Sequence, residues 1–171
     1  MPPDQQFQVE LCESPALPLA VMSHIGAPQR LGQTIRHFIA WRQANQLPPA
    51  RSRTFNLLYD DPSTVDPAEY RFDLACCVAH WPLDRPLTAA AADAPPVFRL
   101  CLAEGLCARV RYIGRDDQLG QAVQYLYQHW LITSGYQLRD APLFFERVKF
   151  FPEVNEADMV TDIYLPVQAR T

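Results

Sequence analysis

Hydrophobic and polar residues are arranged so that they predict the same order of elements twice along the chain. Short apolar runs bounded by proline, glycine or acidic residues are typical of strands, and apolar residues three and four apart indicate helices. The first half is expected to contain strands at 7–11 and 17–24, a helix from 28 to about 45, and strands at 54–59 and 70–79. The second half is expected to contain strands at 97–103 and 106–113, a helix from 116 to Gly135, and strands at 143–150 and 160–167. In each half the first two strands are expected to form a hairpin.

Each predicted helix carries one apolar stripe, which we expect to cover one apolar sheet face. The stripes consist of Leu31, Ile35, Phe38 and Ile39 in the first helix and Leu119, Val123, Leu126 and Trp130 in the second, with Tyr127 as a further candidate. The fold class is therefore α+β. We expect a curved antiparallel sheet with both helices on one side and a ligand cleft between them.

The two halves also share a sequence motif. Ile25-Gly26, followed by Leu31-Gly32-Gln33, recurs 88 residues later as Ile113-Gly114, followed by Leu119-Gly120-Gln121. Trp41 and Trp130, and likewise Asp73 and Asp162, are 89 residues apart. We therefore predict a tandem duplication of one unit. The single domain 1–171 would consist of repeat one at 5–81, a linker at 82–96 and repeat two at 97–168.

Composition narrows the classes of function. A formal net charge of −4 argues against broad binding to nucleic acid backbones, so no direct nucleic acid binding is expected. No apolar run reaches the roughly 20 residues of a membrane span, and the first residues lack signal-peptide features. We expect a cytoplasmic protein without a membrane partner. Five cysteines without zinc-site spacing favour reduced thiols, and the four histidines show no metal-binding motif, so no metal or cofactor is expected.

Several short segments, in a fixed order, are similar to one known family. They are Tyr59-Asp60-Asp61-Pro62 with Pro67 and Tyr70-Arg71-Phe72-Asp73, then Ile113-Gly114, Ala141-Pro142-Leu143-Phe144-Phe145-Glu146, and Thr161-Asp162-Ile163-Tyr164-Leu165-Pro166-Val167. Together they resemble the GyrI-like family over nearly the whole chain. This family includes effector-binding domains of AraC-type and MerR-type multidrug regulators and stand-alone DNA gyrase inhibitory proteins.

The resemblance implies an aromatic-lined cleft between the helices with a glutamate in it. The family glutamate follows a Pro-x-Phe pattern, which places it at Glu146. This sequence has an extra residue between Pro142 and Phe145, and Val148 stands where the family has a tyrosine. The residues give the same candidate independently, because a carboxylate after Leu143-Phe144-Phe145 either faces solvent beside Arg147 or lies in an apolar cleft. In a cleft, a cationic ligand would neutralise it.

Aromatic residues are candidates for the walls of the site. Each has core packing as its alternative, but as a set they would offer flat surfaces for ligand stacking. The predicted ligand-binding residues besides Glu146 are Trp41, Trp130, Tyr59, Tyr112, Tyr127 and Tyr164.

The leading hypothesis is a stand-alone binding module for hydrophobic, cationic small molecules, because few residues precede the first predicted strand. A regulatory role would then act through a regulator chain or by sequestering the ligand. One alternative is interaction with DNA gyrase through the acidic residues Asp60, Asp61, Asp66 and Glu69. Another is a small-molecule hydrolase with Glu146 as the general base. No nucleophile motif is present, so an enzyme is the less favoured reading and no other catalytic residue is assigned.

Overall fold

The computed structural model describes residues 7–60 and 64–171, and the chain divides into two compact units. The central unit contains residues 16–103. The terminal unit contains the described residues 7–15 together with 104–171. The chain therefore starts in the terminal unit, builds the central unit and returns.

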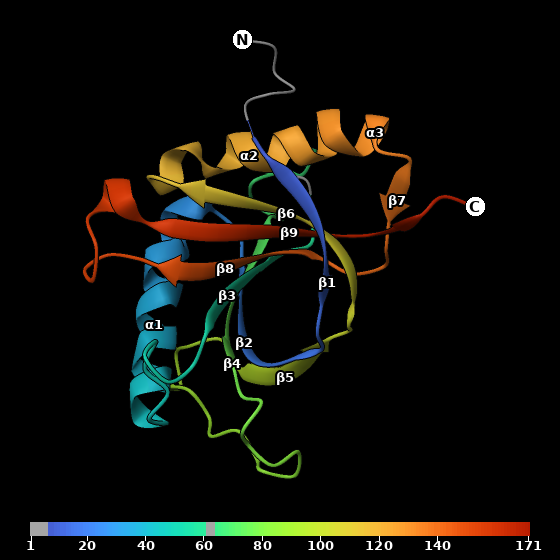
Figure 1. The fold of residues 1–171 in the computed structure, drawn as a ribbon. Helices are drawn as coiled ribbons and strands as arrows, with labels where there is room; N and C mark the ends of the chain where they lie inside the picture. Colours follow the sequence, from blue (N-terminus) through green and yellow to red (C-terminus); the bar gives the residue numbers. More distant parts are fainter. Residues whose placement is uncertain (1–6, 61–63) are drawn as a thin grey trace. The chain divides into compact units, whose positions relative to one another are not determined.

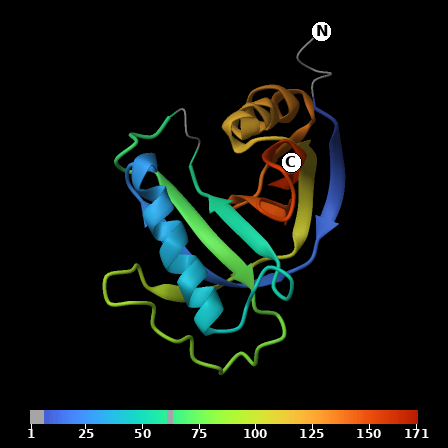
Figure 2. The same ribbon diagram turned by 90° about the vertical axis from the view of Figure 1, so that its left-hand side faces the viewer.

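The central unit is a four-stranded antiparallel sheet with one helix along it. Its elements are β2 (Leu17–Ile25), the 3-10 turn η2 (Pro28–Arg30), α1 (Leu31–Ala44), β3 (Thr54–Leu58), β4 (Arg71–Cys77) and β5 (Val97–Leu102). The strand order is β3-β4-β2-β5. Figure 2 shows α1 lying along one face of β3 and β4. A contact between buried side chains joins helix to sheet: the hydroxyl of Thr34 and Nδ1 of His24 are 2.8 Å apart.

The terminal unit repeats this plan with additions. Its elements are β1 (Val9–Ser14), β6 (Gly105–Ile113), η3 (Asp116–Gln118), α2 (Leu119–Tyr125), the π-helical turn η4 (Leu126–Trp130), α3 (Leu131–Thr133), β7 (Tyr136–Leu138), β8 (Leu143–Lys149), η5 (Glu156–Asp158) and β9 (Val160–Ala169). The strand order is β1-β6-β9-β8, and β7 pairs with the C-terminal end of β9. Figure 1 shows α2 and α3 lying over this sheet.

All the predicted strands are present, but the predicted hairpins are wrong. β1 pairs with β6, with Val9 opposite Val110, and β2 pairs with β5, with Leu17 opposite Leu102. Alternation of apolar residues shows that a segment is a strand without showing which strand is its partner. The connection after Ser14 begins with Pro15, which has no N–H and a fixed φ, and it lacks the glycine that tight hairpin turns favour.

This pairing distributes the strands differently from the sequence repeats. Repeats 5–81 and 97–168 describe similarity along the chain, whereas the compact units describe contacts. The central unit takes β5 from the second half, and the terminal unit takes β1 from the first half.

Local structure in the two halves is equivalent, as the shared motif predicts. Ile25 and Ile113 each end a strand, and each is followed by a 3-10 turn and a helix. Gly26 has φ 121° and Gly114 has φ 145°, a region that favours glycine. Their N–H groups donate to the carbonyls of Tyr70 and Met159, each at 2.9 Å. Segments 25–33 and 113–121 therefore adopt the same local fold.

The predicted apolar stripe of α1 is wrong at two positions. Ile35 and Ile39 are 37% and 48% exposed, whereas α1 buries Thr34, Phe38, Trp41 and Arg42. The buried face is rotated towards Trp41 and Arg42, whose side chains form hydrogen bonds to carbonyl groups of neighbouring loops.

The stripe predicted for the second helix is largely found. Leu119, Val123 and Leu126 are buried, while Trp130 and Tyr127 are half-buried.

The pairing of β1 with β6 predicts which cysteines can be cross-linked. Cys12 of β1 lies directly opposite Cys107 of β6. Directly opposed residues have Cα atoms about 4.5–5.5 Å apart, within the range that a disulfide spans. Mild oxidation with copper–phenanthroline should join Cys12 to Cys107, as seen by peptide mass mapping, and a Cys12→Ser variant should lose the product. Burial raises the pKa of the Cys107 thiol to about 11, so alkaline conditions favour the reaction. A Cys101–Cys107 product in place of the Cys12–Cys107 product would contradict the observed pairing.

Candidate functional site

Glu146 belongs to a cluster of carboxylate and aromatic residues on two neighbouring strands. In the antiparallel pair β8–β9, Glu146 lies opposite Asp162 and Phe144 lies opposite Tyr164. Opposed residues point to the same side of a sheet, and so do residues two apart on one strand. Phe144, Glu146, Asp162 and Tyr164 therefore share one face, here named the carboxylate–aromatic face.

The carboxylate–aromatic face is the side of the terminal sheet away from α2. Arg147, the neighbour of Glu146, points to the other side, where its Nη1 donates to Asp116 Oδ1 at 2.7 Å, just before α2. Tyr112 of β6 also lies on that side, and its hydroxyl donates to the Arg115 carbonyl at 2.7 Å. Helix and carboxylate–aromatic face are thus on opposite sides of the sheet.

An arginine balances the buried carboxylate of this face. Asp162 has a side chain 5% exposed and accepts hydrogen bonds from Arg111 Nε at 2.8 Å and Arg111 Nη2 at 3.0 Å. This two-point contact raises the pKa of Arg111, so the guanidinium stays charged. Arg111 therefore compensates Asp162. The second carboxylate of the face belongs to half-buried Glu146.

Two stacked rings lie beside these carboxylates. The rings of Phe144 and Tyr164 are 4.8 Å apart between centroids and within 8° of parallel. Phe144 is buried and Tyr164 is half-buried. Burial raises the pKa of the Tyr164 phenol, and the Asp162 and Glu146 carboxylates add to the rise, whereas a hydrogen bond with Arg109 lowers it. The net shift is upward, so the phenol stays neutral and its ring offers a flat apolar surface.

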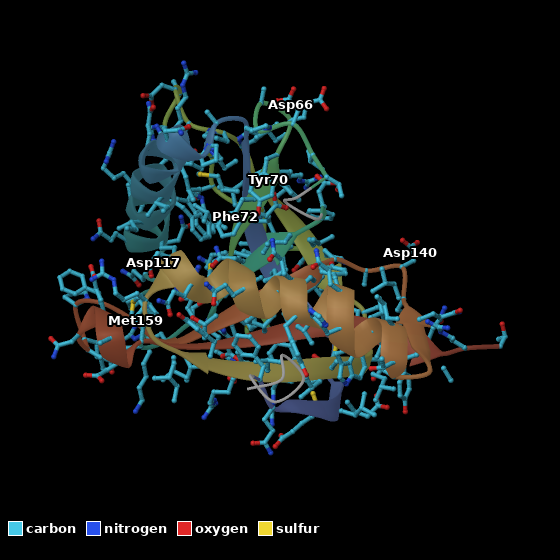
Figure 3. The ribbon with its side chains drawn as sticks, turned by 90° about the horizontal axis from the view of Figure 1, so that it is seen from above. Asp66, Tyr70, Phe72, Asp117, Asp140 and Met159 are labelled. Atoms are coloured by element: carbon cyan, nitrogen blue, oxygen red, sulfur yellow. The ribbon has the colours of Figure 1, made fainter. Side chains whose placement is uncertain are left out.

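The other predicted aromatic residues of the terminal unit lie elsewhere in it. Tyr112 is buried. Tyr127 and Trp130 belong to the π-helical turn, and Trp130 stacks on Tyr136 with centroids 5.9 Å apart. Figure 3 shows this helical segment running over the sheet from Asp117 toward Asp140. Single π-helical turns are frequent at functional sites, so Tyr127 and Trp130 remain candidates on the helix side.

The two predicted site residues of the central unit, Trp41 and Tyr59, differ in exposure. Trp41 is 3% exposed, and its indole N–H donates to the Thr88 carbonyl at 2.9 Å. Tyr59 is 39% exposed, and the Arg71 guanidinium lies 4.1 Å from its ring centroid. Burial and the neighbouring Asp73 carboxylate raise the pKa of Tyr59. Trp41 thus packs as a core residue, whereas Tyr59 presents a ring at the surface.

Of the seven predicted site residues, the structure brings Glu146 and Tyr164 onto one face. Sequence reasoning missed Phe144 as a site residue, although its place two before Glu146 in a strand was a usable signal. It also missed the role of Asp162, although Asp162 stands out in the repeat comparison. In the central unit, Leu57 lies opposite Asp73 in the place that Glu146 has opposite Asp162. Only the second copy carries a glutamate at this position.

Other sequence-based candidates are less informative. Of the acidic residues considered for gyrase contact, Asp66 and Glu69 are exposed, and Asp66 Oδ1 accepts a hydrogen bond from the Ala68 N–H at 2.9 Å. Asp61 and Pro62 lie outside the described residues, as do residues 5 and 6 of the first repeat.

The described residues contain no metal-site cluster and no candidate membrane span. Within 7–60 and 64–171, no three histidine, cysteine or acidic residues are grouped as a metal site would need. In the same part of the chain, no helix has the length and apolar character needed to cross a membrane.

Comparison with known proteins identifies the family. The model of the GyrI-like small molecule binding domain matches residues 7–168, and the chain therefore belongs to the GyrI-like family. Among individual proteins, it is 30% identical over 162 residues to the probable transcriptional regulator YgiV of Escherichia coli K12, covering 94% of this chain and 96% of YgiV.

Solved structures share the fold. The C-terminal domain of EcmrR superposes with a TM-score of 0.74 at 17% identity, covering 97% of this chain and all of that domain. In the EcmrR–DNA complex, the chain spans 58% of the EcmrR chain. SAV2435, solved with tetraphenylphosphonium bound, superposes with a TM-score of 0.54 at 14% identity, covering 94% of each chain. At these identities the likeness concerns the fold.

Proposed function

We propose that this GyrI-like protein binds lipophilic cations at the carboxylate–aromatic face of the terminal unit. The observation that carries the proposal is the placement of Glu146 on the same face as the stacked Phe144–Tyr164 pair. The face thus combines a carboxylate with flat apolar surface.

The charge of the ligand follows from the cost of burying a carboxylate. A carboxylate taken out of water loses solvation free energy, and a neutral ligand that covers it does not compensate this loss. A cation restores Coulomb energy in surroundings that screen it less than water does. Its aromatic groups gain in addition from the Phe144 and Tyr164 rings.

The relatives support a cationic ligand but do not identify the compound. SAV2435 binds tetraphenylphosphonium, a cation surrounded by four aromatic rings. YgiV carries the description of a probable transcriptional regulator, and EcmrR forms a complex with DNA. We propose an effector-binding role, in which the bound cation signals through a regulator chain or is sequestered.

A comparison of a cationic and a neutral arylphosphorus compound tests the proposal. Tetraphenylphosphonium should bind more tightly than neutral triphenylphosphine oxide, by about 5- to 150-fold for an ionic contribution of roughly 1–3 kcal/mol. Isothermal titration calorimetry at low and high salt measures both affinities, and the preference should weaken as salt screens the carboxylate. Equal affinities for the two ligands at low salt would refute cation selectivity.

A further inference from the structure

A cavity of about 460 Å³ opens in the central unit, at the C-terminal end of α1. Its lining residues are Asn45, Gln46, Arg51, His80, Trp81 and Arg85. Two of these are arginines, one is a histidine, and none is acidic. Asp84, next to Arg85, is exposed and does not line the cavity. In a protein of net charge −4, this is a local concentration of positive charge.

One wall of the cavity is aromatic and already holds a cation. Trp81 is 7% exposed, and the Arg85 guanidinium lies 3.7 Å from its ring centroid. Trp81 in turn packs against buried Trp41, with ring centroids 6.4 Å apart. Stacking orients the guanidinium and leaves its N–H groups at the edge available to a ligand.

Hydrogen bonds hold the two segments that carry the arginines. Arg42, which is 6% exposed, donates from Nε to the Leu47 carbonyl and from Nη2 to the Ser52 carbonyl, each at 2.8 Å. These bonds fix both ends of the loop that carries Arg51. Arg99 Nη2 donates to the Pro82 and Arg85 carbonyls at 3.0 Å and 2.7 Å. Both cationic segments are therefore held in place by the fold.

The C-terminal end of α1 forms another part of the cavity wall. Gln46 has φ 57°, the left-handed conformation that commonly ends a helix, and the Leu47 N–H donates to the Arg42 carbonyl at 2.9 Å. The amide of Asn45 is occupied, since its Nδ2 donates to the Trp41 carbonyl at 2.8 Å and its Oδ1 accepts from the Thr88 hydroxyl at 2.9 Å. Asn45 is thus a fixed wall, while the side chain of Gln46 is exposed at the cavity.

We infer that this cavity binds a small anion. Its carboxylate or phosphate group is held by Arg51 and by Arg85, whose guanidinium is oriented by its contact with the Trp81 ring. Arginine is the side chain best suited to such oxyanions because its planar N–H groups match their geometry. The site lies within the central unit and takes the opposite charge from the proposed cation site, so it constitutes a second binding activity.

Titration with three naphthalene compounds tests this inference. The probes are 1-naphthyl phosphate, 1-naphthoate and neutral 1-naphthol, measured by calorimetry at low and high salt. The two anions distinguish phosphate from carboxylate recognition. At least one anion should bind more tightly than 1-naphthol, and Arg51→Gln and Arg85→Gln should each weaken that anion by about 5- to 30-fold.

The control is Arg36→Gln, which removes the same charge from an exposed position on α1 outside the cavity. It should leave anion affinity unchanged. Thermal melting shows whether each variant is folded, and Arg51→Gln provides a test independent of the Arg85 contact with Trp81. The inference is overturned if 1-naphthol binds as tightly as both anions, or if Arg36→Gln weakens binding as much as the cavity variants do.

Discussion

Replacing Trp41 by alanine is expected to lower the free energy of unfolding by about 3–5 kcal/mol, the usual cost of deleting a buried tryptophan. Trp41 is 3% exposed, its ring lies parallel to Phe38 with centroids 5.9 Å apart, and its N–H is bonded to the Thr88 carbonyl at 2.9 Å. The substitution removes this packing and leaves that carbonyl without its donor. Urea denaturation monitored by circular dichroism measures the loss.

Trp130 provides the matched control, because it occupies the corresponding position of the second helix. It is half-buried and stacks on Tyr136, so Trp130→Ala should cost only about 1–2 kcal/mol. Losses of equal size would contradict the different roles of the two tryptophans. If Trp41→Ala left stability unchanged and weakened tetraphenylphosphonium binding, Trp41 would be a ligand contact instead of a core residue.

The elements of this fold could be predicted from the sequence because they depend on local patterns. The 88-residue recurrence located both strand ends at Ile25-Gly26 and Ile113-Gly114, where a positive φ requires glycine. Strand partners could not be predicted, since the pairing of β1 with β6 depends on segments about 100 residues apart. The short strand β7 was missed because three residues carry too little pattern.

The residues buried on α1 show a second limit of prediction from the sequence. Ile35 and Ile39 are apolar and exposed, whereas Arg42 is polar and buried. A buried guanidinium is acceptable here because its N–H groups reach the Leu47 and Ser52 carbonyls and the Thr54 hydroxyl. Those acceptors lie in a loop and a strand beyond the helix, so helical periodicity alone could not identify them.

The candidate site was predictable in part. Strand alternation and family resemblance both indicated Glu146, and Tyr164 was among the aromatic candidates. That the two lie on one face depends on the register of β8 against β9, which places Glu146 opposite Asp162. This register cannot be predicted from the sequence. The contributions of Phe144 and Asp162 were therefore found only in the structure.

Glu146→Gln is expected to remove the preference for cations while retaining the volume of the side chain. The wild-type preference for tetraphenylphosphonium over triphenylphosphine oxide should fall by about 5- to 150-fold, which corresponds to roughly 1–3 kcal/mol. Affinity for the neutral compound should stay the same or improve, because an amide costs less to cover than a carboxylate. The matched control is Glu153→Gln, which removes one exposed carboxylate elsewhere in the terminal unit.

The most direct test of the cation site is therefore a calorimetric titration of wild-type, Glu146→Gln and Glu153→Gln protein with both compounds at low salt. The proposed function predicts a strong preference for tetraphenylphosphonium in the wild type and in Glu153→Gln, and loss of that preference in Glu146→Gln alone. An unchanged preference in Glu146→Gln would contradict the assignment of Glu146 as the residue that selects the charge of the ligand.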